Sequence, residues 1–179
     1  MKFFSLLFIT LFFLSGIVKA QTKEEMQASQ ARYEKLTKLC EKEPKKTGIP
    51  DVDTYVSNVY NAAIAAMATT ELLQDLYYRQ IGETKDGVTD VTIKKPTVEE
   101  LSALSVTIAA QAITLTEASK TADKALKASK EQKNPMKAAK ITSVLAFTKD
   151  AYPILVEESA LQTKAIAAMI ETATTAKNL

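Results

Sequence analysis

Residues 96–135 read PTVEELSALSVTIAAQAITLTEASKTADKALKASKEQKNP and contain one helix with both of its ends. The Thr97 to Glu100 spacing is typical of a capping box, in which each residue satisfies a free backbone group of the first turn. Asn134 and Pro135 are typical of the N-cap and first position of a following helix. The stretch therefore predicts two long helices joined by a very short turn. The first has a seam of apolar and small residues at helical spacing: Leu101, Leu104, Ile108, Gln111, Leu115, Ala118, Ala122 and Ala125.

Glycine and proline divide the rest of the chain into similar segments, since each is unfavourable inside a helix. Helical periodicity covers about 23–43 and 51–81, and it runs from 135 towards 177. Pro153 alone interrupts a periodic run, and we expect it to kink the last helix or break it near Tyr152. The predicted fold is all-α, an elongated antiparallel up-down bundle of three to four long helices. Expected core residues include Ala63, Met67, Ile108 and Leu115.

The first twenty residues, MKFFSLLFITLFFLSGIVKA, have the pattern of a secretory signal peptide. We expect cleavage before Gln21, leaving 21–179 as a single helical-bundle domain that is periplasmic or extracellular. The residue directly after the predicted cleavage site is Gln21 and not the cysteine that would carry a lipid, so we do not expect a lipoprotein. Loss of Lys2 and Lys19 would leave 21 basic and 21 acidic residues from the 23 and 21 of the whole chain. A neutral mature chain does not indicate nucleic-acid binding.

Composition limits the chemistry, because the chain has no His, no Trp and one Cys. Without His it cannot build a His-based zinc or haem site or a Ser-His or Cys-His nucleophile pair. We predict no catalytic, cofactor or metal site, and a protein that is not an enzyme. Cys40 lies on the first apolar seam, where two interpretations stand: a buried inert thiol or an intermolecular disulfide in an oxidising compartment.

Acidic pairs raise the alternative of a carboxylate-dependent hydrolase, which needs two carboxylates facing one cleft. Adjacent residues on a helix point in different directions, and the sequence favours solvated helix surfaces or complements to the helix dipole. This alternative is therefore ranked last. The pairs are Glu99 with Glu100, Glu157 with Glu158, Asp51 with Asp53, and Glu71 with Asp75.

The loop 82–96 is the longest piece without helical periodicity. Its β-favouring residues and the Asp86-Gly87 turn signal predict a small hairpin or an ordered loop. Asp86 and Asp90 are too few oxygen ligands for a calcium loop.

Two stretches, 54–70 and 101–116, carry no charge. A pore-forming or other membrane-active protein could have such stretches, but both fall short of the ~20 apolar residues of a membrane span. Enclosure inside the bundle is the favoured interpretation.

The predicted topology places the connectors around 44–50 and 134 at one end. Lysines gather there, including Lys137 and Lys140 near a helix N-terminus, where the helix dipole disfavours them. Solubility and dipole complement explain some of these lysines. The residues predicted to form an anionic-partner surface are Lys45, Lys46, Lys124, Lys127, Lys137 and Lys140.

The sequence thus predicts an exported, non-enzymatic helical protein that binds another macromolecule, such as an adaptor, secretion-apparatus or envelope-associated subunit. The expected partner is an anionic protein or envelope component, not nucleic acid, and a homo-oligomer is compatible with the pattern. The alternative is a membrane-active or pore-forming helical protein.

Overall fold

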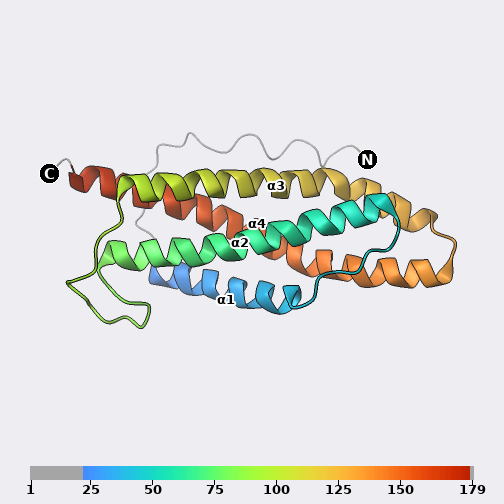
Figure 1. Cartoon of the computed structure of the whole chain (residues 1–179), viewed down its shortest axis with the longest axis horizontal. Helices are drawn as coiled ribbons and strands as arrows, with labels where there is room; N and C mark the ends of the chain where they lie inside the picture. The colour runs from blue at the N-terminus through green and yellow to red at the C-terminus, as the bar shows by residue number, and fades with distance from the viewer. Residues whose placement is uncertain (1–21, 178–179) are drawn as a thin grey trace.

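The computed structural model describes residues 22–177, which form four α-helices joined by connectors and one ordered loop (Figure 1). The expected signal peptide lies outside the described residues. The helices run alternately in opposite directions, so the predicted antiparallel bundle is confirmed (Figure 1). Their bounds are α1 Lys23–Cys40, α2 Pro50–Ile81, α3 Val98–Glu131 and α4 Pro135–Lys177.

Local capping determines where the helices begin and end. Thr97 and Glu100 form the predicted capping box at the start of α3. Asn134 caps α4, because its side-chain oxygen accepts hydrogen bonds from the backbone N–H groups of Met136 and Lys137 at 3.0 and 3.2 Å. Gly82 ends α2 with a φ of 73°, a left-handed conformation that glycine adopts without strain.

Proline 153 does not divide α4, so of the two predicted alternatives the break does not occur. Its ring lies at the exposed surface, where water can satisfy the Lys149 carbonyl that loses its helical donor. Ala151 and Leu155, on either side of the proline, are 0% and 1% exposed. Burial on both sides holds the helix together through the residue that disfavours it.

The four helices do not contribute equally to the bundle. The helices α2, α3 and α4 all contact one another, whereas α1 contacts α2 and α4 and, within residues 22–177, makes no contact with α3. Helix α1 therefore lies over the groove between α2 and α4, on the side away from α3 (Figure 1). It is also the shortest of the four helices, and it ends before it reaches the end of the bundle at which α2 and α4 begin (Figure 1).

The apolar core consists of three clusters along the bundle. The first lies towards the 82–97 loop and comprises Met26, Leu73, Leu76, Tyr77, Leu101, Leu104, Ile108, Ala165, Ile166 and Met169. The second, central cluster comprises Leu36, Val59, Ala62, Ala63, Ala66, Leu115, Ala118, Ala151 and Leu155. The third lies towards the other end and comprises Val52, Val56, Ala125, Ile141 and Val144.

Three of the four residues singled out as core are confirmed: Ala63, Ile108 and Leu115 are buried. Met67 is only partly buried, so that prediction is wrong in degree. It lies at the rim between α1 and α2, where its sulfur accepts a hydrogen bond from the Thr37 hydroxyl at 3.4 Å.

The segment between α2 and α3 is an ordered loop with a single antiparallel bridge, between Glu83 and Thr89. Gly87 takes a φ of 79° at the predicted turn. The Asp90 carboxylate accepts hydrogen bonds from the N–H and hydroxyl of Thr92 at 2.8 and 2.6 Å. Those bonds fold the segment on itself and use the Asp90 side chain for turn geometry.

Candidate functional site

A layer of hydrogen-bonded polar side chains separates the first apolar cluster from the second. Its centre is Glu158 of α4, which is fully buried. One carboxylate oxygen of Glu158, Oε1, accepts hydrogen bonds from the hydroxyls of Ser29 and Thr70 at 2.5 and 2.8 Å. The other, Oε2, accepts from Nε of Arg32 at 2.6 Å. Helices α1 and α2 are thereby both tied to α4.

Gln162, one turn after Glu158, extends this layer to α3. Its Nε2 donates to the hydroxyl of Thr70 at 2.9 Å and to the carbonyl of Ala66 at 3.1 Å. Its Oε1 accepts a hydrogen bond from Nε2 of Gln111 at 2.9 Å. All four helices therefore contribute to one buried network, which we call the polar layer: Ser29, Arg32, Thr70, Gln111, Glu158 and Gln162.

The interpretation of Glu157 and Glu158 as solvated surface is wrong for Glu158, although Glu157 is exposed. The sequence did contain an indication that Glu158 is buried. Between Leu155 and Ile166, the positions on the line along α4 that joins these two residues hold no apolar residue. Glu158 and Gln162 fill that interval at helical spacing.

The arrangement suits structure better than chemistry. Glu158 is 0% exposed and is held by four protein donors, the fourth being Gln162 Nε2 at 3.4 Å, so a substrate cannot reach it without opening the core. A buried polar atom without a hydrogen-bond partner lowers the stability of the folded state. Arg32 Nη2 and Gln111 Oε1 are two such atoms here. We infer that this buried ion pair helps to specify which helices meet and in what register.

The other acidic pair that shares a helix face, Glu71 and Asp75, is divided between two partners. Glu71 accepts a hydrogen bond from the Tyr33 hydroxyl. Asp75 forms an ion pair with Arg79, with 3.6 Å between the closest nitrogen and oxygen. The two carboxylates therefore do not face a common cleft in this structure.

The sequence-predicted lysines lie where the connectors 41–49 and 132–134 meet the same end of the bundle (Figure 1). We call this surface the lysine-rich end. Within the described chain, none of its lysines takes part in an ion pair, and every one is exposed. Its members are Lys42, Lys45, Lys46, Lys124, Lys127, Lys130, Lys133, Lys137 and Lys140.

Asp53 fixes the connector that carries Lys45 and Lys46. Its carboxylate accepts hydrogen bonds from the N–H and hydroxyl of Thr47 at 2.6 and 2.7 Å and from the N–H of Gly48 at 3.0 Å. Burial opposes the charged form, but these bonds and the charge of Lys140 lower the pKa of Asp53 below its ordinary value. Lys45 and Lys46 therefore lie on a connector that hydrogen bonds hold against the start of α2.

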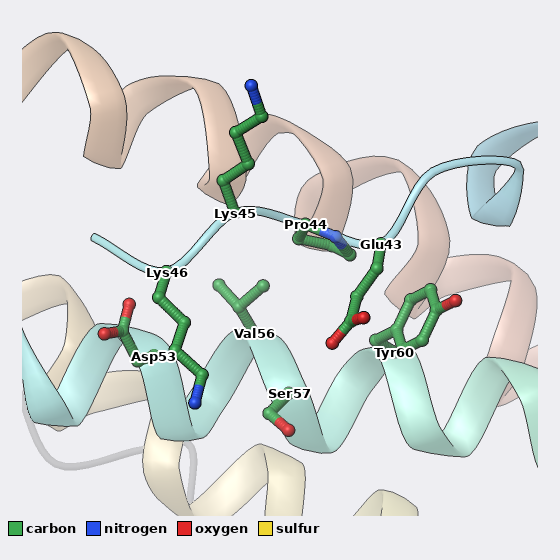
Figure 2. Close-up of a pocket in the computed structure, with 8 residues that line it drawn as sticks. All are labelled: Glu43, Pro44, Lys45, Lys46, Asp53, Val56, Ser57 and Tyr60. Atoms are coloured by element: carbon green, nitrogen blue, oxygen red, sulfur yellow. The ribbon is translucent and has the colours of Figure 1, made fainter. Parts of the chain in front are cut away.

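A small cavity lies between this connector and α2 (Figure 2). Its volume is about 40 Å³, too small for the 300 to 1,000 Å³ of a ligand pocket. Figure 2 also shows that Lys45 and Lys46 leave opposite sides of the connector. The two lysines therefore place positive charge on both sides of the connector and do not concentrate it on one side. The lining residues are Glu43, Pro44, Lys45, Lys46, Asp53, Val56, Ser57 and Tyr60.

At the opposite end of the bundle, acidic residues are more often paired. Arg79 contacts Glu100 at 3.0 Å as well as Asp75, and Lys23 contacts Glu83 at 2.6 Å. Helices α1 and α3 begin at this end and carry acidic residues in their first turns, whereas α4 begins at the lysine-rich end and carries none in its first turn. The two ends thus differ in pairing as well as in charge.

The uncharged stretch 101–116 is enclosed on one face only. Among the described helices, α3 is the one long and apolar enough to cross a membrane, by length and composition alone, and 33% of its most apolar window is buried. Val106 and Ile113 are 71% and 65% exposed. Enclosure explains the stretch 54–70 well, because α2 contacts all three other helices. For the outer face of α3 the enclosure interpretation is wrong.

Cys40, at the end of α1, is a free and half-buried thiol. Burial raises its pKa, which lowers its reactivity as a nucleophile.

No protein-family model, curated protein or solved structure matches this chain.

Proposed function

We propose that this protein is an exported, non-enzymatic helical bundle that binds an acidic partner protein through its lysine-rich end. The observation that carries the proposal is the group of nine exposed lysines that form no ion pair with any residue of the described range 22–177. Like charges gathered at one end repel one another, and an acidic partner removes that repulsion. Export rests on the signal pattern of residues 1–20.

The composition of this end favours a protein over a lipid surface. Met136, at the start of α4, is 84% exposed and lies among the lysines. Leu126, between Lys124 and Lys127, is also 47% exposed, and isolated apolar anchors with a charged rim are typical of a protein interface. A membrane-surface helix needs a continuous apolar face beside its basic face. An adaptor or an envelope-associated subunit fits this description.

The test uses a quadruple variant, in which Lys45, Lys46, Lys137 and Lys140 are changed to Glu. We expect the wild-type protein to bind a poly-glutamate peptide at low salt and to lose affinity as salt rises. The variant should bind at least tenfold more weakly and remain folded, because exposed substitutions usually cost under ~0.5 kcal/mol each.

A matched control changes four exposed lysines elsewhere to Glu, with the same change in net charge: Lys35, Lys85, Lys94 and Lys95. Wild-type protein that ignores the peptide at low salt would overturn the proposal. Equal losses in both variants would show that only net charge matters. Preferential binding to vesicles rich in phosphatidylglycerol would replace the acidic protein by a membrane.

The second candidate is a membrane-active protein, and the exposed apolar face of α3 is the observation in its favour. That face also carries Ser102, Thr107 and Thr116, and charged residues bound it at both ends. Release of dye from vesicles by the purified protein would support this candidate. A carboxylate-dependent hydrolase has the least support, because Glu158 is enclosed and Glu71 and Asp75 have separate partners.

A further inference from the structure

The outer face of α3 is an apolar seam that no described element covers. Its members lie four, three, four and three residues apart, which is the spacing of a coiled-coil seam. All of them are exposed, because α3 packs against α2 and α4 through its opposite face. We call this seam the α3 outer face: Ser102, Val106, Ala109, Ile113 and Thr116, with Ala110 beside Ala109.

The ends of the α3 outer face carry opposite charges. Glu99, at the N-terminal end, is exposed and has no side-chain partner among the described residues. Lys120, at the C-terminal end, is 65% exposed and is bonded only to Glu117, one turn away. Helical periodicity places Glu99 and Lys120 on the same side of α3 as Val106 and Ile113. The seam therefore has at one end a carboxylate that is unpaired within residues 22–177, an apolar middle, and at the other end an ammonium group whose partner Glu117 lies on the same face.

We propose that the α3 outer face binds the same face of a second copy of this chain, with the two α3 helices antiparallel. A two-fold axis between Ala109 and Ala110 places Val106 opposite the partner's Ile113. The same register places Glu99 opposite the partner's Lys120, and symmetry repeats each contact. The small side chains at the centre let the two helices approach closely.

Charge complementarity selects this occupant and this orientation. In a parallel, in-register pair, Glu99 would face a second Glu99 and Lys120 a second Lys120, which is unfavourable. The hydrocarbon core of a bilayer offers no counterpart for either charge. The seam from Ser102 to Thr116 is also about 22 Å long at 1.5 Å per residue, shorter than the ~30 Å hydrocarbon core of a bilayer.

The expected dimer is weak, because one helix face of this length buries less than the ~1,600 Å² of a standard interface. Sedimentation equilibrium over a concentration series up to the millimolar range should therefore show a monomer–dimer equilibrium. Ile113→Glu should weaken dimerisation at least tenfold. The matched control is Leu72→Glu on α2, because Leu72 is 55% exposed and lies outside the seam; it should leave dimerisation unchanged.

A charge exchange tests the register. Glu99→Lys alone and Lys120→Glu alone should each weaken the dimer, and the double variant should restore it, since opposite charges again face each other. Circular dichroism of each variant verifies that the bundle is intact. Failure of the double variant to recover overturns the antiparallel register.

A cysteine experiment tests the orientation directly. In a Cys40→Ser background, mixed Val106→Cys and Ile113→Cys chains should form a heterodisulfide faster than either forms a homodisulfide. Faster homodisulfides would indicate a parallel pair and overturn the proposal. A protein that stays monomeric at the highest concentration, or that loses vesicle binding on Ile113→Glu, also overturns it, the second result assigning the face to a membrane. These outcomes are independent of the lysine-rich end.

Discussion

Replacement of Arg32 by Met is the most direct test of the polar layer. Arg32 supplies the only positive charge that contacts Glu158 among the described residues, through a 2.6 Å hydrogen bond between Nε and Oε2. The Glu158 side chain is 0% exposed and the Arg32 side chain is 15% exposed. Removal of one partner of a buried ion pair costs about 3–5 kcal/mol, because the remaining charge stays buried without compensation. This is a large fraction of a typical stability of about 5–15 kcal/mol.

The assays are urea unfolding and thermal unfolding of Arg32→Met at neutral pH, both monitored by circular dichroism. At roughly 2–4 °C per kcal/mol for a domain of this size, the melting temperature should fall by about 6–20 °C. Lys164→Met is the control, because its ion pair with Glu25 is similarly short, 2.7 Å, but is 51% and 31% exposed. It should cost at most about 1 kcal/mol. The double variant Arg32→Met with Glu158→Gln should recover part of the loss, because it removes the uncompensated charge and keeps an oxygen that can accept from Ser29 and Thr70. A single Arg32→Met variant as stable as the control would refute the reasoning.

Three further predictions follow from the packing and the caps. Ile108→Asp should lower the free energy of unfolding by more than ~3 kcal/mol, because Ile108 is 2% exposed and the new charge would be buried. Val106→Asp should change it little, because Val106 is 71% exposed. Equal effects of the two variants in urea unfolding would contradict the buried and exposed faces assigned to α3. Thr97→Ala should cost ~1 kcal/mol, since it removes the hydroxyl that caps α3, and an unchanged unfolding midpoint would show that the box is dispensable. The pKa of Asp53 is lower in the folded chain than its ordinary value, so its contribution is present above the ordinary Asp pKa and is lost as pH falls through the folded pKa. The protection factors of the Thr47 and Gly48 amides, which correct for the intrinsic pH dependence of exchange, should therefore fall in acid and in Asp53→Asn at neutral pH, and protection factors unchanged by both would contradict the anchoring role.

The features predicted correctly from the sequence are those set by neighbouring residues. The capping box of Thr97 and Glu100 and the Asn134 cap depend on residues two or three positions apart, so the order of residues in the sequence is sufficient to predict them.

One helix end was predicted less well. Helix α1 ends at Cys40, three residues before the predicted end, because no periodic apolar residue follows Cys40 to hold another turn.

The features that were missed depend on residues far apart in the chain. The partners of Glu158 on α1 lie 129 and 126 residues away, and nothing in the local pattern pairs them. The predicted seam of α3, from Leu101 through Ile108 to Leu115, is its buried face, but the stretch 101–116 carries no charge on the opposite face either, so the sequence did not show that this second face stays exposed. Met67 lies on the seam of α2 but meets the edge of α1, a position that only the packing of the helices defines.

The early end of α1 has a consequence for how the bundle opens. The third apolar cluster has five buried members, against ten and nine in the other two, and α1 supplies none of them. We therefore expect this end to be the part that unfolds locally at the lowest free energy. The lysine-rich end lies at this same end of the bundle, so a ligand held there stabilises the closed form by mass action. Binding then shows as slower exchange of amides deep in the end of the bundle, at positions the ligand never touches.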